Sequence, residues 1–219
     1  MRPPAVWLIS VEDEEVFRIS NFRFPLWGMP NLEPARFHSA GDPPTQYFAS
    51  HPLGTYPELL RVTERARGRR VVAGDVAAAQ NFKLWTLKLT TDDVFELNFD
   101  SAPIVGLTPD ELVADDHQAC RIAGRTYGHL DPEFPKVWRY TSASFPGTVN
   151  FAVFGPRVMS EYLRPALTPG DVPGTLAANH ARVAGLVLDH MRHIGESHDE
   201  LDHFRLGKVY DWVQPVDFP

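Results

Sequence analysis

Five polar side chains of this sequence have the types needed for chemistry, and they come from segments spread along the chain. Arg18 lies in "VFRIS", Arg36 opens "RFHSAG", Tyr47 lies in "TQYFA", Glu58 follows "TYP" and Ser142 ends "WRYTS". Arg18 is a charge between apolar neighbours of a predicted strand. Two arginines that converge can bind a phosphate or a carboxylate through paired hydrogen bonds. The set therefore raises the hypothesis of a site for an anionic ligand.

Each of the five also has an ordinary structural explanation. Arg18 could form a salt bridge within a sheet, and an arginine in a loop such as Arg36 is usually solvated. Tyr47 could be a core aromatic with its hydroxyl at the edge, and Glu58 is favoured by the dipole of the helix that it would begin. Ser142 could be a turn residue. Residue type and spacing alone leave these alternatives open.

The elements that must position these residues are mainly strands. Segments rich in β-branched and aromatic residues predict strands at 5–9, 15–20, 45–49, 82–90, 94–99, 136–142 and 149–154. Helices are predicted at 57–66, 108–128 and 175–200, the second of them with a capping box from Thr108 to Glu111. Strands and helices do not alternate regularly, which favours an α+β fold with mostly antiparallel sheets. No glycine-rich dinucleotide or phosphate-loop motif is present.

Composition narrows the class of protein. A chain of 219 residues, 43% hydrophobic, suits a single domain over 1–219. The net charge of −7 argues against a nucleic-acid binder, which needs a cationic surface. The single cysteine, Cys120, permits no intramolecular disulfide, and the apolar run near the N-terminus is too short for a membrane span. We therefore expect a cytoplasmic protein that binds neither nucleic acid nor membrane.

The order of the five residues resembles the RES family, which is named for its arginine, glutamate and serine. The resemblance covers about residues 15 to 155 and is carried by "FRIS", "ARFHSAG", "TQYFASHPLGTYPELLR" and "WRYTSASFPGTVNFAVFG". The matching residues are Arg18, Arg36, Tyr47, Glu58 and Ser142. Ser142 is preferred over Ser144 because Tyr140 precedes it at the spacing of the family.

The resemblance implies an ADP-ribosyltransferase-like fold with split, mostly antiparallel sheets and a few flanking helices. It also implies a toxin of a bacterial toxin–antitoxin pair that consumes NAD, with inorganic phosphate as a possible second substrate and an antitoxin as a possible partner. In that chemistry Glu58 would stabilise positive charge on the ribose, and Arg18 and Arg36 would bind the pyrophosphate. Tyr47 would stack on the nicotinamide, and Ser142 would orient ribose, water or phosphate.

The sequence departs from the family at the second arginine. The family often has two glycines, arginine, tryptophan and asparagine where this chain has Pro34, Ala35, Arg36, Phe37 and His38. Two other functions stay open: an ADP-ribosyltransferase that modifies a protein or metabolite, and a non-catalytic module that binds a nucleotide or partner. No metal is expected: His190 and His193 could share a helix face, but the wider spacings of the run at 189–203 are not those of a metal site.

Overall fold

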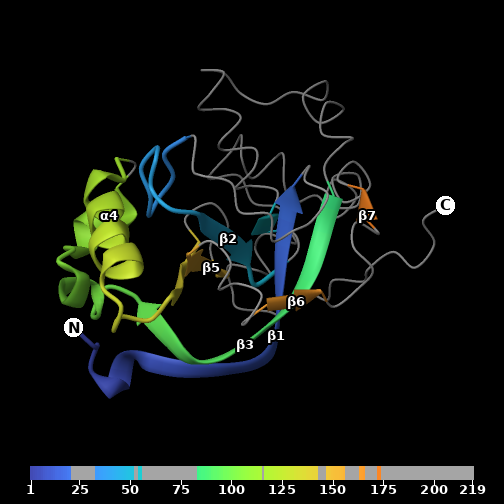
Figure 1. Ribbon diagram of the computed structural model, residues 1–219, viewed down its shortest axis with the longest axis horizontal. Helices are drawn as coiled ribbons and strands as arrows, with labels where there is room; N and C mark the ends of the chain where they lie inside the picture. The colour runs from blue at the N-terminus through green and yellow to red at the C-terminus, as the bar shows by residue number, and fades with distance from the viewer. Residues whose placement is uncertain are drawn as a thin grey trace.

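Two long strands form the frame of the fold, β1 (Leu8–Ser20) and β3 (Lys83–Leu97). The computed structural model describes residues 1–20, 33–51, 54–55, 83–114, 116–142, 147–155, 163–165 and 172–173. Within this part of the chain, β1 and β3 pair antiparallel along most of their length and appear as two long bent ribbons in Figure 1. The predicted helices at 57–66 and 175–200 lie outside the described residues.

Each long strand joins segments that the sequence predicts as separate. The prediction of a strand at 5–9 is wrong in its first part, because Ala5–Trp7 form the 3-10 helix η1. The acidic run that follows stays in β1 through shifts of register between Ile9 and Glu14. Asp13 has a positive φ of 50°, and its backbone N–H donates to the Thr90 hydroxyl at 3.0 Å. The irregularity lets a solvated, charged stretch remain part of the strand.

The strands close into a barrel. The order is β1, β2 (Thr45–Ala49), β5 (Val149–Phe154), β4 (Val137–Thr141) and β3, and the pairing of β1 with β3 completes the ring. The pair β3–β4 is parallel and the other pairs are antiparallel. Two short strands, β6 (Leu163–Pro165) and β7 (Val172–Pro173), pair with β3. The expectation of mostly antiparallel strands with few helices is confirmed. The expectation of split sheets is not, because the described strands belong to one sheet that closes through the pairing of β1 with β3.

Side chains of the barrel strands alternate between two cores. The interior core contains Val16, Phe48, Leu87, Leu89, Val94, Val137, Phe151 and Val153, and each barrel strand contributes to it. The outer core lies between the sheet and the helices and includes Phe37, Phe95, Trp138, Tyr140 and Phe154. Because β5 is buried on both faces, its sequence reads as a nearly continuous apolar run.

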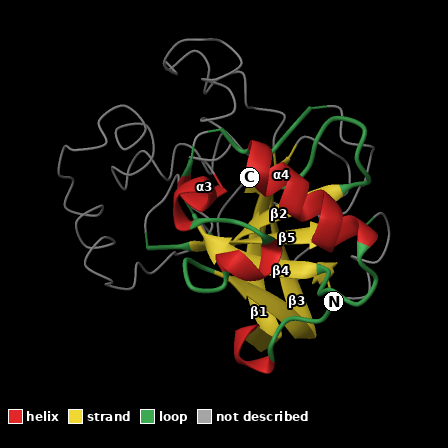
Figure 2. Ribbon diagram, turned by 90° about the vertical axis from the view of Figure 1, so that its left-hand side faces the viewer, coloured by secondary structure: helices red, strands yellow, loops and turns green. Residues whose placement is uncertain are grey.

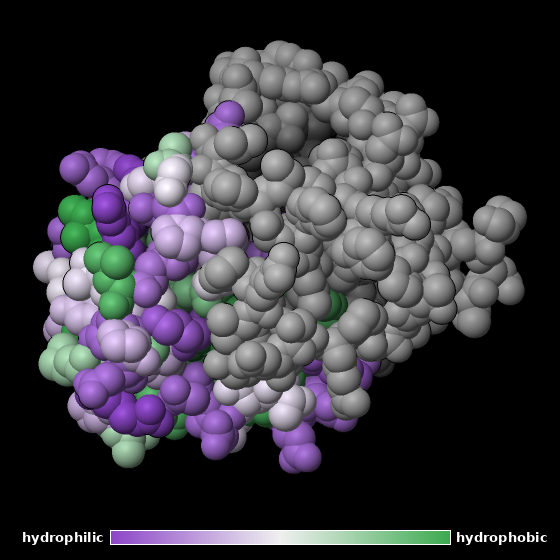
Figure 3. Space-filling view, in the orientation of Figure 1, coloured by the Kyte–Doolittle hydropathy of each residue, from purple (hydrophilic) through white to green (hydrophobic). Residues whose placement is uncertain are grey.

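The helices that cover the outer face are short. They are η4 (Ala102–Val105), α3 (Pro109–Val113), α4 (Gln118–Ala123) and the π-helix η5 (Gly124–Leu130). Figure 2 shows α3 and α4 on the same side of the strands. None of the described helices is long and apolar enough to cross a membrane. In the view of Figure 3 the described surface is largely hydrophilic, with hydrophobic residues in small groups.

The prediction of one helix over 108–128 is wrong in its middle. The capping box is present, since the Glu111 N–H donates to the Thr108 hydroxyl at 3.2 Å and the Thr108 N–H donates to the Glu111 carboxylate at 2.9 Å. However, α3 ends at Val113. The Asp116 carboxylate then accepts the N–H of Gln118 at 3.0 Å, at the start of α4. Asp116, which reads as an exposed mid-helix charge, thus lies before the N-cap residue His117 and bonds the first N–H of α4.

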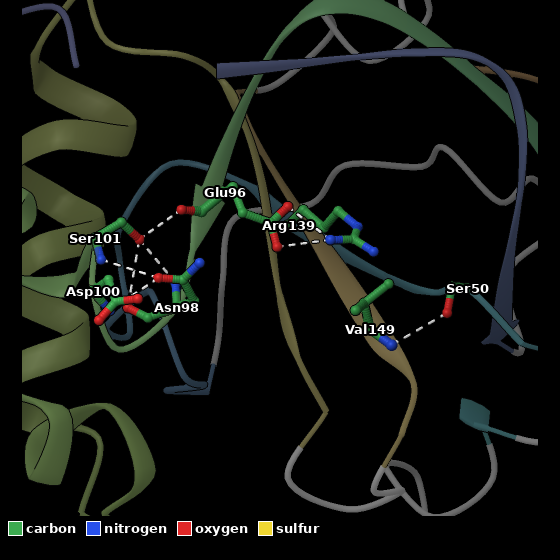
Figure 4. A network of polar contacts seen from close by, with 7 residues as sticks. All are labelled: Ser50, Glu96, Asn98, Asp100, Ser101, Arg139 and Val149. Atoms are coloured by element: carbon green, nitrogen blue, oxygen red, sulfur yellow. Dashed lines mark hydrogen bonds and ion pairs between the residues drawn. The ribbon is translucent and has the colours of Figure 1, made fainter. Parts of the chain in front are cut away.

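A polar turn fixes the path of the chain from β3 to η4. Asn98 accepts the N–H groups of Asp100 and Ser101 on its side-chain oxygen, each at 3.0 Å, and the Ser101 hydroxyl donates to the Glu96 carbonyl at 2.6 Å (Figure 4). The Glu96 carboxylate accepts both of its bonds from Arg139 Nη1, at 2.7 Å, between neighbouring strands β3 and β4. The turn therefore leads directly from the barrel wall to the helical layer.

Candidate functional site

The segment that carries Arg36 is anchored by the phenylalanine next to it. Phe37 is fully buried in the outer core, with edge-to-face contacts at 5.4 Å to Trp138 and 5.0 Å to Tyr140 between ring centroids. Such aromatic pairs add to the stability that burial gives. Phe37 therefore fixes the segment that carries Arg36 on the sheet.

Arg36 lies between the sheet and the end of α3. Its guanidinium carbon is 5.0 Å from the centroid of the Tyr140 ring and 5.7 Å from that of Phe37. Its Nη2 donates to the carbonyl of Leu112 in the last turn of α3. Its Nε is buried without a hydrogen-bond partner. The side chain therefore has a structural role at the end of α3, and one of its buried donors is still unsatisfied.

Tyr47 connects this segment to β2. Its hydroxyl oxygen accepts the N–H of Phe37 at 3.0 Å and lies 3.0 Å from Nδ1 of His38. The ring is partly buried and packs against the outer core. The Tyr47 hydroxyl therefore contacts the backbone next to Arg36 and the ring of His38. Stacking of Tyr47 on a nicotinamide stays a prediction.

His38 is the buried end of this set of hydrogen bonds. Its exposed fraction is 6%, and its Nε2 lies 3.0 Å from the carbonyl oxygen of Glu33. A carbonyl can only accept, so Nε2 carries a proton and Nδ1 accepts the hydroxyl proton of Tyr47. Burial lowers the pKa of His38 below its usual value, while a hydrogen bond to the Glu33 carbonyl and the charge of Asp42 oppose the shift in part. The ring is therefore neutral at physiological pH.

Ser142 lies just beyond the end of β4. It is buried, and its N–H donates to the carbonyl of Thr148 at 3.0 Å, which continues the pairing of β4 with β5. Ser142 comes two residues after Tyr140, a residue of β4 whose ring lies under the guanidinium of Arg36. Ser144 lies outside the described residues, and so does Glu58, the predicted carboxylate.

Arg18 is brought to a different face of β2. Its Nη1 donates to the side-chain oxygen of Gln46 at 2.5 Å, and its guanidinium carbon is 5.9 Å from the centroid of the Phe48 ring. Phe48 belongs to the interior core, whereas Tyr47 between them on the strand packs outward. Burial lowers the pKa of Arg18 to about 10. The structure therefore brings Arg36, Tyr47 and the end of β4 to one face and places Arg18 on the other.

The sequence gives little indication of which buried polar residues lie near the two arginines. His38 follows the arginine motif and reads there as a polar residue of a loop, although it is buried. Gln46 is 2% exposed, and its Nε2 has no hydrogen-bond partner. Gln46 contacts the first arginine, Arg18, and the signal that could have singled it out is an amide within the predicted strand "TQYFA". Cys120 is buried, and burial raises the pKa of its thiol, as expected for a packed cysteine.

A hollow of about 410 Å³ lies elsewhere on the surface. It is lined by Arg2, Asp93, Pro132, Glu133, Phe134 and Lys136. The cation of Arg2 pairs with Asp93 at 2.9 Å, and the Lys136 ammonium donates to the backbone carbonyls of Gly128 and Asp131. These charges already have partners within the protein. None of the predicted site residues lines this hollow, so we do not place the site there.

Comparison with known proteins gives a likeness of fold. No family model matches the chain, and no curated protein sequence matches it. Among solved structures, the chain is similar to a chain of the M. tuberculosis MbcT–MbcA toxin–antitoxin complex, with a TM-score of 0.61 and 19% sequence identity. The similar region covers 78% of this chain and 90% of the other. At this identity the comparison shows a shared fold.

Proposed function

We propose that the chain is an NAD-consuming enzyme that cleaves the bond between nicotinamide and ribose and acts as a toxin. The observation that carries the proposal is the convergence of Arg36, Tyr47 and the end of β4 at Ser142 on one face of the sheet. The likeness of fold to a chain of a toxin–antitoxin complex supports it. The proposal includes the ADP-ribosyltransferase-like assignment of the fold and an antitoxin as a partner.

The proposed reaction separates a cationic leaving group from a sugar. When the C1′–N bond breaks, its electron pair stays with nicotinamide, which leaves as a neutral molecule, and positive charge develops on the ribose. A carboxylate next to the ribose stabilises that charge, and we assign this role to Glu58. Attack of water at C1′ gives ADP-ribose and a proton, whereas attack of phosphate gives ADP-ribose 1-phosphate. We assign to Ser142 the hydrogen bond that orients the ribose or the attacking group.

The two arginines set a condition on how the dinucleotide binds. Arg36 is half-buried on the outer face, with a buried Nε that lacks a partner. Arg18 contacts Gln46 and Phe48 on the interior face. A pyrophosphate that lies along the outer face would therefore contact Arg36, and Arg18 could contact it only at an end of the barrel. We assign the outer contact to Arg36 and the inner one to Arg18.

The experiment that tests the function is incubation of the purified chain with NAD, with and without inorganic phosphate. We expect nicotinamide to be released, together with ADP-ribose 1-phosphate in phosphate buffer or ADP-ribose without phosphate. Transfer of labelled ADP-ribose to an added protein would instead identify a transferase. Binding of NAD without release of nicotinamide would identify a binding module, and the proposed function would then be wrong.

Replacement of Arg36 by alanine is expected to raise the KM for NAD by about tenfold or more, because a charge-assisted contact with the pyrophosphate is lost. The loss of the bond to the Leu112 carbonyl should also lower the unfolding temperature. Steady-state kinetics and thermal unfolding measure the two effects separately.

The matched control is Arg2→Ala. Arg2 is an exposed arginine whose Nη2 donates to the Asp93 carboxylate at 2.9 Å, at the hollow that none of the predicted site residues lines. Ion pairs at the surface contribute little to stability, so neither KM nor the unfolding temperature should change much. An unchanged KM in the Arg36 variant would contradict the assigned contact.

A further inference from the structure

We propose that His38 is a positioning residue of the NAD site: its uncharged ring holds the Tyr47 hydroxyl, which in turn holds the backbone next to Arg36. The predicted effect of His38 on the KM for NAD rests on the proposed function. The inference goes beyond that function, because it assigns a role to His38 and predicts that NAD binding depends on pH. It concerns His38, Tyr47 and the segment from Glu33 to Phe37.

The hydrogen bonds form a chain with one direction. The His38 ring donates from Nε2 to the carbonyl of Glu33, its Nδ1 accepts from the Tyr47 hydroxyl, and the same hydroxyl oxygen accepts from the Phe37 N–H, each at 3.0 Å. The segment is also closed by a backbone bond from the Ala35 N–H to the His38 carbonyl at 3.0 Å. Arg36 lies within this closed segment, so the position of its guanidinium depends on these bonds.

Protonation of His38 would change this arrangement in two ways. Nδ1 would become a donor, so the bond with Tyr47 would have to reverse its direction. A full charge would also be placed on a ring that is 6% exposed. Burial accordingly lowers the pKa of His38. Because the folded pKa lies below the unfolded one, stability present near neutral pH is lost as the pH falls from the unfolded pKa through the folded one.

The charged and titratable groups that act on His38 include Asp42 and His129. Asp42 is buried in the same loop, accepts the Ser39 N–H at 2.7 Å and pairs with Arg125. Its charge raises the pKa of His38 but does not outweigh burial. His129 on η5 accepts or donates a bond with the Thr45 hydroxyl at 2.9 Å, and burial lowers its pKa to about 4. His129 is therefore neutral over the pH range from 5 to 8.

Asparagine offers a matched replacement. Its amide oxygen can take the place of Nδ1 and accept from Tyr47 without titrating, whereas the shorter side chain does not reach the Glu33 carbonyl as Nε2 does. His38→Asn should therefore keep the bond with Tyr47 at all pH values, with some loss of stability. His38→Leu fills the space but removes both bonds, which leaves the Tyr47 hydroxyl and the Glu33 carbonyl without this partner.

The test measures kcat and KM for NAD between pH 5 and 8 in the natural chain and both variants. In the natural chain we expect KM to rise severalfold as the pH falls below the pKa of His38, itself below about 6.5. In His38→Asn, KM should not follow this titration. In His38→Leu, KM should be raised roughly tenfold at every pH, with a smaller change in kcat.

Nitrogen NMR of the histidine rings gives a readout that does not depend on turnover. We expect the His38 ring to be neutral with the proton on Nε2 at pH 7, and expect this preference to weaken in Tyr47→Phe. A proton on Nδ1, a His38 pKa at or above the usual value, or the same pH dependence of KM in His38→Asn would overturn the inference. If the natural chain does not cleave NAD but the NMR result is as expected, the proposed function fails while the hydrogen-bond arrangement stands.

Discussion

Replacement of Gly124 by alanine is expected to destabilise the protein by roughly 3 kcal/mol and to weaken NAD binding, although the glycine lies outside the candidate site. Gly124 begins the π-helix η5. An ideal Cβ on this residue would lie 2.1 Å from the carbonyl oxygen of Phe37 and 2.8 Å from its carbonyl carbon and Cβ. The Phe37 backbone would have to move, and this backbone carries Arg36. Denaturant unfolding and the KM for NAD measure the two consequences.

Because of the backbone angles of Gly124, it is informative whether Gly124→Ala lowers or raises the free energy of unfolding. Its φ of −60° and ψ of −42° are those of an ordinary helical residue, so alanine meets no conformational strain there. In a helix without close contacts, the same substitution stabilises by up to about 1 kcal/mol. A loss of stability would therefore report only the contact with Phe37. Unchanged or increased stability would show that the segment carrying Arg36 is free to move away from η5.

Gly106→Ala is the matched control. An ideal Cβ at Gly106 meets nothing within 4 Å, but its φ of 72° lies in the left-handed region. The expected loss is about 1 kcal/mol from backbone conformation, and KM for NAD should not change. The two glycines thus separate a steric effect at the site from a local conformational effect at the end of η4.

The strand positions could be predicted from the sequence where both faces of a strand are buried. The segments at 45–49 and 149–154 agree in both bounds with β2 and β5. The sequence does not show that the acidic run before Val16 stays within β1, because solvated charges read as a loop. The end of α3 at Val113 could not be foreseen either. The Asp116 carboxylate bonds the first N–H of α4, but acidic residues are common on exposed helical surfaces, so their presence does not indicate a break between helices.

The neighbourhood of Arg36 and Tyr47 could be predicted in part. Their closeness in sequence suggested a shared site, and the bond from the Phe37 N–H to the Tyr47 hydroxyl brings them together. The buried state of His38 and the contact of Gly124 with Phe37 depend on segments far apart in the chain. The face that Arg18 occupies depends on closure of the barrel between β1 and β3, which spacing along the chain does not determine.

Glu58→Gln is expected to lower kcat for NAD cleavage by at least about 100-fold, without a comparable change in the unfolding temperature. Glutamine keeps the volume and hydrogen-bonding capacity of the side chain but removes the negative charge. In the proposed reaction that charge acts mainly as positive charge develops on the ribose, so the loss should appear in kcat and kcat/KM more than in binding. Single-turnover kinetics with the enzyme in excess over NAD, at an enzyme concentration above KM, measure the chemical step directly.

The control for the charge change is Glu12→Gln, at an exposed glutamate of β1. It makes the same change of net charge away from the candidate site, so kcat should be unaffected. In bacterial cells, expression of the natural chain should arrest growth and expression of the Glu58 variant should not, since depletion of NAD requires turnover. Growth arrest by a Glu58 variant that releases no nicotinamide would mean that toxicity has another cause. Full cleavage activity in that variant would mean that another group stabilises the ribose cation.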